Sequence, residues 1–155
     1  MARKFYLIEL APNFPEQVLQ YTVAHEYHHT IHWESRKDHS RNLLQDVMVE
    51  GRAEMFAKQV YPGIEVPWNS ALPPGTEKQI WQVLKENKDS TNTGMLDDFF
   101  NGNPSKGLPR WSNYKIGYKI IEKYVEENPD VPIEEWTQLP AVEILELSHY
   151  QDKFN

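Results

Sequence analysis

The stretch H-E-Y-H-H at positions 25–29 contains an H-E-x-x-H pattern, in which two histidines stand four positions apart and a glutamate follows the first. In a helix, residues four apart lie on one face, with Cβ atoms about 5–6 Å from each other. One zinc ion can bridge His25 and His29 across that gap, because Zn–N bonds are about 2.0–2.1 Å long. Glu26 then stands beside the metal, where it can take a proton from a water molecule that the metal activates. The pattern therefore predicts hydrolytic zinc chemistry.

A third ligand must come from another element, and Glu50 is the best candidate. It lies in a second predicted helix, which the intervening loop can turn back alongside the first. Two histidines and one glutamate would leave the fourth position of a tetrahedral zinc ion to water, as a catalytic site requires. Gly51 follows directly, and the lack of a side chain there lets two helices approach closely, at a cost of roughly 1 kcal/mol for glycine in a helix.

Glu54 stands one helical turn after Glu50, on the same face of that helix. We expect its carboxylate to accept the free ring N–H of a zinc-bound histidine and so to fix the tautomer, with His25 as the expected partner. The alternative is a solvated surface glutamate. Because Glu54 lies in an otherwise apolar run, we favour the buried position.

Peptide hydrolysis at such a site creates an oxyanion, which a hydrogen-bond donor near the metal would stabilise. Tyr114 and Tyr118 lie four apart in a predicted helix, directly after a loop that ends at Arg110. We favour Tyr114, because it stands nearer the start of the helix and the loop. The alternative, that either ring packs against neighbouring helices, is supported at least as well.

Two further histidines, His28 and His32, are also four apart, but no glutamate follows His28. On a helical wheel His28 points about 60° away from the midpoint of the His25 and His29 pair. We therefore expect His28 and His32 on the surface or around the metal rather than among its ligands.

The remaining pattern is that of a mostly α protein, formally α+β. Residues 5–10 are rich in β-forming side chains and predict a single strand, the remnant of a small sheet. We expect Asn13, Thr76 and Asp130 to cap helices. Apolar spacing and the positions of Gly and Pro predict helices over 15–33, 41–60, 76–87, 113–127 and 141–150, with shorter ones over 95–100 and 130–136.

The composition bounds the class of protein. The 155 residues are enough for one domain with a real core, and the net charge of −7 argues against a nucleic acid or an anionic membrane as partner. The chain has no cysteine, so any metal must be held by histidine and carboxylate. No apolar run approaches the ~20 residues of a membrane helix, and no signal peptide is visible, so a cytoplasmic location is the default expectation.

These motifs resemble those of the gluzincin clan of zinc metallopeptidases, in which the third ligand is a glutamate on the next helix. More narrowly, the chain is similar to a bacterial family of predicted zinc-dependent proteases. The similarity lies in A-H-E-Y-H-H at 24–29, V-E-G-x-A-E at 49–54 and N-Y-x-x-G-Y at 113–118. It implies His25, His29 and Glu50 as zinc ligands, Glu26 as base and proton shuttle, and a peptide or protein as substrate. It leaves the roles of Tyr114 and Tyr118 open.

One departure from that clan matters. A β-sheet normally precedes the H-E-x-x-H helix there, and its edge strand holds the substrate backbone. Only fourteen residues precede Pro15 here, so we expect residues 1–155 to be a zincin-like domain with a reduced sheet, or a fragment of a longer chain.

Two alternatives to a peptidase stay open. The first is a His-rich, solvated helix face that binds nothing. The second is a non-catalytic interaction module in which zinc holds two helices together. The missing sheet favours this second alternative, as does the expected exposure of four tryptophans, Trp68, Trp81, Trp111 and Trp136.

Overall fold

The computed structural model describes residues 9, 11–36, 39, 41–70 and 72–154, and this part of the chain is built from helices. The α-helices are α1 (Glu16–Ser35), α2 (Leu43–Val60), α3 (Thr76–Asn87), α4 (Thr93–Asn101), α5 (Ser112–Glu127), α6 (Ile133–Gln138) and α7 (Ala141–Leu147). Three short 3-10 helices are η1 (Pro67–Asn69), η2 (Pro104–Lys106) and η3 (Tyr150–Phe154). The mostly α fold is thus confirmed, whereas the predicted strand over 5–10 falls, except for Glu9, outside the described residues. No helix within the described ranges has the length and apolarity needed to cross a bilayer.

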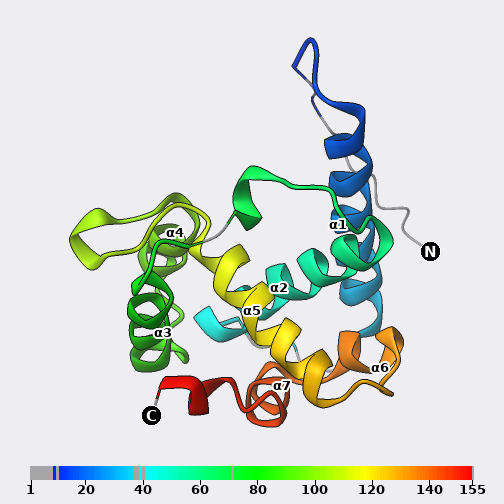
Figure 1. Cartoon of the computed structure of the whole chain (residues 1–155). Helices are drawn as coiled ribbons and strands as arrows, with labels where there is room; N and C mark the ends of the chain where they lie inside the picture. Colours follow the sequence, from blue (N-terminus) through cyan, green and yellow to red (C-terminus); the bar gives the residue numbers. More distant parts are fainter. Residues whose placement is uncertain (1–8, 10, 37–38, 40, 71, 155) are drawn as a thin grey trace.

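Helix α2 lies in the middle of the molecule, with α5 packed along it (Figure 1). Helices α1 and α6 lie to one side of this pair, and α3 and α4 lie to the other. Twelve of the eighteen residues of α2 are buried, as expected for a helix that is apolar on most of its faces. Its start is capped by Asn42, whose side chain accepts a hydrogen bond from the Gln45 N–H at 2.9 Å.

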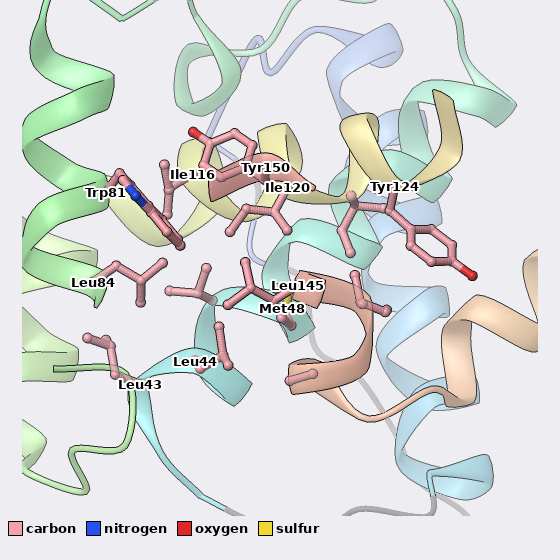
Figure 2. Packing of buried hydrophobic residues seen from close by; sticks show 14 of the residues in the cluster. Leu43, Leu44, Met48, Trp81, Leu84, Ile116, Ile120, Tyr124, Leu145 and Tyr150 are labelled. Carbon is pink, nitrogen blue, oxygen red and sulfur yellow. The ribbon is translucent and has the colours of Figure 1, made fainter. Parts of the chain in front are cut away.

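The main hydrophobic core fills the space between α2, α3, α5 and α7. Figure 2 shows Ile116 and Ile120 of α5 facing Leu44 and Met48 of α2, with Trp81 of α3 at one side. Trp81 and Trp136 are only 3 % and 1 % exposed, so the expectation that both lie at the surface is wrong. A second, smaller cluster joins α1 to the second half of α2 and consists of Tyr21, Ala24, Ala57 and Val66.

The expected side-chain caps of three helices are wrong. Asn13 adopts φ +72°, outside the extended region that a capping residue needs, and Pro15 takes the capping position of α1. Gly75 precedes α3 with φ +81°, so that Thr76 already lies inside the helix. Pro132 takes the capping position of α6 in place of Asp130. None of these three ends has a side-chain capping hydrogen bond.

His28 and His32 fasten α6 to α1. Of the two positions expected for them, at the surface or around the metal, the surface position is wrong. Both side chains are 2 % exposed. The Nε2 atom of His28 lies 3.0 Å from Thr137 Oγ1, and the Nδ1 atom of His32 lies 3.2 Å from the Thr137 carbonyl oxygen. Burial, with positive neighbours, lowers the pKa of His28 to about 3 and that of His32 to about 4, so both rings are neutral near pH 7.

Two glycines form the crossing point of α2 and α5. A Cβ atom added to Gly51 would lie 2.2 Å from the carbonyl carbon of Gly117, and one added to Gly117 would lie 2.2 Å from the carbonyl oxygen of Val47. The two backbones therefore touch directly. Gly51 does allow a close approach of helices, as expected, and its partner is α5. Glu50 precedes Gly51, and Tyr114 lies three residues before Gly117. The contact between the two glycines therefore brings Glu50 and Tyr114 near each other.

We predict that Gly51→Ala lowers the free energy of unfolding of the metal-free protein by about 2–3 kcal/mol or more, because the added methyl group must push two backbones apart. Urea denaturation in the presence of a chelator measures this change. The matched control is Gly94→Ala in α4, where an added Cβ meets only the Asn92 side chain, at 3.1 Å. That control should change stability by about 1 kcal/mol or less. Equal effects of the two substitutions would contradict the crossing point described here.

Candidate metal centre

Three side chains from two helices converge on one point. The Nε2 atoms of His25 and His29, one turn apart on α1, lie 2.9 Å from each other. The Oε2 atom of Glu50, on α2, lies 3.2 Å from the first nitrogen and 3.4 Å from the second. A tetrahedral zinc ion with bonds of about 2.0–2.1 Å needs ligand atoms about 3.3–3.4 Å apart. The spacing of these three atoms fits zinc after shifts of a few tenths of an ångström.

The chemistry of the donor set also fits a cation. The Oε2 atom of Glu50 is buried and makes no well-directed hydrogen bond, although a buried carboxylate oxygen without one is costly. Among the described residues, His25, His29 and Glu50 are the only group of histidine and carboxylate side chains close enough together to share an ion. Three protein ligands would leave a tetrahedral ion with one open position.

When no metal is bound, the His25 ring holds a proton at this site. Burial by itself would lower the pKa of His25, but the adjacent carboxylates of Glu50 and Glu54 raise it to about 9. Burial would raise the pKa of Glu50, but the neighbouring His25 and His29 lower it to about 2. The metal-free site therefore contains a positive His25 beside a negative Glu50 near pH 7.

Glu54 holds His25 from its other side. Its Oε1 atom lies 2.7 Å from His25 Nδ1, and the carboxylate is fully buried. The Tyr21 hydroxyl donates to Oε2 at 2.8 Å, and the Trp68 indole N–H donates to Oε1 at 2.8 Å. With Nδ1 facing Glu54, the Nε2 atom of His25 is left to face His29 and Glu50.

The sequence analysis did not predict three residues near the candidate metal centre: Tyr21, Trp68 and Asp46. Tyr21 stands one turn before His25 on the same face of α1, which is a signal that could have found it. Trp68 comes from η1, in a loop whose position no helical pattern gives. Asp46 stands one turn before Glu50 on α2. Burial raises the pKa of Asp46 to about 6, and the charge of Glu50 adds to this, while a hydrogen bond with Asn113 opposes it.

A cleft of about 250 Å³ opens beside the metal centre. Its lining consists of Thr22, His25, Glu26, Trp68, Phe100, Trp111 and Tyr114. The Tyr114 ring stacks on the His25 ring, with centroids 5.5 Å apart and an interplanar angle of 15°. Burial, followed by the charges of Glu50, Glu54 and Glu26, raises the pKa of the Tyr114 phenol, so its hydroxyl keeps its proton. The structure thus brings Glu26 and Tyr114 to the same cleft.

Tyr118 lines a different cavity, of about 480 Å³, together with Lys58, Lys115 and Glu122. Burial and the nearby Glu122 carboxylate raise its pKa. Arg110, at the end of the loop before α5, is exposed and lies over the Trp111 ring, with its Cζ atom 4.4 Å from the centroid. Neither side chain belongs to the lining of the cleft that holds Glu26.

Comparison with known proteins identifies the family. A family model described as "Predicted Zn-dependent protease (DUF2268)" matches residues 3–146, and the chain therefore belongs to this family. The resemblance seen in the sequence is confirmed at this level. No curated protein and no solved structure matches the chain. The zinc dependence in the family's description agrees with a His/His/Glu group that could bind the metal.

We predict that Glu54→Gln weakens zinc binding by roughly 10–100-fold, because an amide holds the His25 ring less firmly than a carboxylate. His25→Ala should weaken it further, since it removes one of the three candidate ligands. Competition titration with a zinc-sensitive dye measures both. The matched control is Glu65→Gln, a change of the same type at a side chain that is 78 % exposed. Unchanged zinc affinity in Glu54→Gln would contradict this role.

The pKa of His25 leads to a second prediction. Because the pKa is raised from 6.5 to about 9, the charge of His25 stabilises the metal-free fold fully below pH 6.5, and this contribution is lost as the pH rises through about 9. Zinc needs a neutral histidine, so its binding at pH 7 should release about one proton from His25. Calorimetry in two buffers with different ionisation enthalpies counts that proton. The prediction fails if wild type releases no more protons than His25→Ala.

Proposed function

We propose that this chain is a zinc-dependent peptidase whose metal is held by His25, His29 and Glu50. The observation that carries the proposal is the set of three donor atoms spaced 2.9–3.4 Å apart, with one ligand, His25, at the wall of a cleft. The family description points to the same class of reaction.

Zinc, when bound, supplies a Lewis acid that polarises a peptide carbonyl and lowers the pKa of water. Glu26 is the general base in this proposal. Its carboxylate takes one proton from the attacking water as the oxygen bonds to the carbonyl carbon. Glu26 then gives this proton to the amide nitrogen as the C–N bond breaks. The products are a carboxylic acid and an amine, and Glu26 returns to its starting state.

Tyr114 is the donor that stabilises the oxyanion in this proposal. Its hydroxyl keeps its proton because its pKa is raised, and its ring lies against His25. Tyr118 is the less favoured candidate, since it lines the separate cavity described above.

The alternative of a zinc-stabilised interaction module explains fewer observations. Helices α1 and α2 are already joined by the cluster of Tyr21, Ala24, Ala57 and Val66, so a metal is not needed to hold them. Of the four tryptophans considered exposed, Trp81 and Trp136 are core residues. A chelator should therefore abolish hydrolysis and leave most of the helical circular dichroism signal, whereas a purely structural zinc site would lose its fold.

We predict that Glu26→Gln lowers kcat/KM for peptide hydrolysis by roughly 10²–10⁴-fold, because the amide cannot accept the proton. Zinc stoichiometry and thermal stability should stay at the wild-type level, since Glu26 is not among the proposed ligands. Cleavage of a defined peptide mixture, followed by mass spectrometry, gives the rates. The matched control is Glu16→Gln, an exposed glutamate in the first turn of the same helix. Full activity in a zinc-loaded Glu26→Gln protein would remove the proposed base.

A further inference from the structure

The cleft beside the metal centre has aromatic walls. Trp68 and Trp111 meet edge to face, with ring centroids 6.1 Å apart and an interplanar angle of 70°. Phe100 and Tyr114 form a second pair, also with centroids 6.1 Å apart. These rings come from η1, from α4, and from the first turn of α5 and the residue before it. Four separate chain positions thus supply one apolar surface.

Two of these aromatic residues, Phe100 and Trp111, have features that cost folding free energy. Phe100 is 39 % exposed. Trp111 has φ +62°, in the left-handed region that bulky residues rarely adopt. The backbone N–H of Trp111 donates to the Phe100 carbonyl at 2.8 Å, so one hydrogen bond fixes both positions. Backbone strain of this kind gathers at functional sites, and a ligand would cover the exposed ring.

Trp68, another aromatic residue of the cleft wall, is hydrogen-bonded to a residue of the candidate metal centre. The indole N–H of Trp68 donates to Glu54 Oε1, the same oxygen that lies 2.7 Å from His25 Nδ1. The ring of Trp68 therefore stands at a fixed position relative to the proposed metal ligand. A subsite built this way is formed before a substrate arrives.

The charge of the cleft restricts what it can bind. Glu26 and His25 are the titratable groups in its lining apart from the protonated Tyr114, and no lysine or arginine is present there. An acidic side chain would meet the Glu26 carboxylate. A basic side chain would pair with Glu26, the only carboxylate of the lining, and so occupy the proposed base. A large uncharged apolar side chain fits this lining.

We propose that this aromatic cleft binds an aromatic or large aliphatic side chain next to the scissile peptide bond. The inference rests on the proposed peptidase function and adds its substrate class: peptides with residues such as Phe or Leu at the cleavage site. Phe100, Trp111 and Trp68 would set this specificity, while Glu26 and the metal ligands carry out the reaction.

The test compares two peptides of equal length that differ only by Phe or Gly at one position, incubated with the zinc-loaded protein. Wild type should prefer the Phe peptide by about tenfold or more in kcat/KM, as apolar subsites typically discriminate. Phe100→Ala and Trp111→Gly should each lower kcat/KM for the Phe peptide and thereby reduce this preference severalfold. Glycine accepts φ +62° without strain, which offsets part of the packing against Trp68 that Trp111→Gly removes, and circular dichroism checks that both variants are folded. The matched control is Leu147→Ala on α7, which is 41 % exposed and should keep the preference.

A binding measurement separates this inference from the peptidase itself. The same two peptides are titrated onto zinc-loaded Glu26→Gln protein, with tryptophan fluorescence as the readout. Cleavage without preference for Phe, or a preference that survives both substitutions, would overturn the aromatic subsite and leave the peptidase standing. Selective binding of the Phe peptide without cleavage by wild type would support the aromatic subsite and overturn the peptidase function. The absence of both binding and cleavage would overturn both proposals.

Discussion

A single buried carboxylate, that of Glu54, connects the parts of this molecule. Removing such a charge from water is costly unless each oxygen finds partners. Here Oε2 accepts a hydrogen bond from Tyr21, and Oε1 faces both the indole of Trp68 and the imidazole of His25. These partners come from α1 and η1, while Glu54 itself belongs to α2. One residue thereby sets the distance between the two helices, the rotation of a ring at the metal centre and the place of a cleft wall.

The histidines of α1 show how environment divides one residue type into two roles. His25 faces Glu50 and Glu54, and its pKa is raised. His28, three residues on, packs between Trp136 and Phe56 and contacts Thr137, and its pKa is lowered. The first ring can exchange a proton for a metal ion. The second is a neutral packing residue that locates α6.

Local periodicity accounts for what could be predicted from the sequence. Spacings of four within a helix place His25 with His29, and Glu50 with Glu54, without any knowledge of tertiary structure. The partners that come from elsewhere could not be found in this way. Trp68 lies in a loop, and the contact of α2 with α5 depends on two glycines that are 66 positions apart (117 − 51). The surface position considered for His28 and His32 was wrong because a helical wheel gives the direction of a side chain but does not say that α6 covers that side. The predicted capping residues were wrong where a Pro, or a Gly in the left-handed region, occupies the position before the helix. The roles of the site residues in catalysis remain predictions.

The glycine contact also makes α5 a lever with an off-centre pivot. At 1.5 Å per residue, Tyr114 lies only about 4.5 Å along the axis from Gly117, whereas the far end of the helix at Glu127 lies about 15 Å away. If α5 tilts about that pivot, the displacement grows in proportion to the distance, so the far end moves roughly three times as far as Tyr114. Changes in the packing of α7 and η3 against the far half are thus attenuated before they reach the cleft. The geometry around His25 is thereby shielded from small movements at the other end of α5.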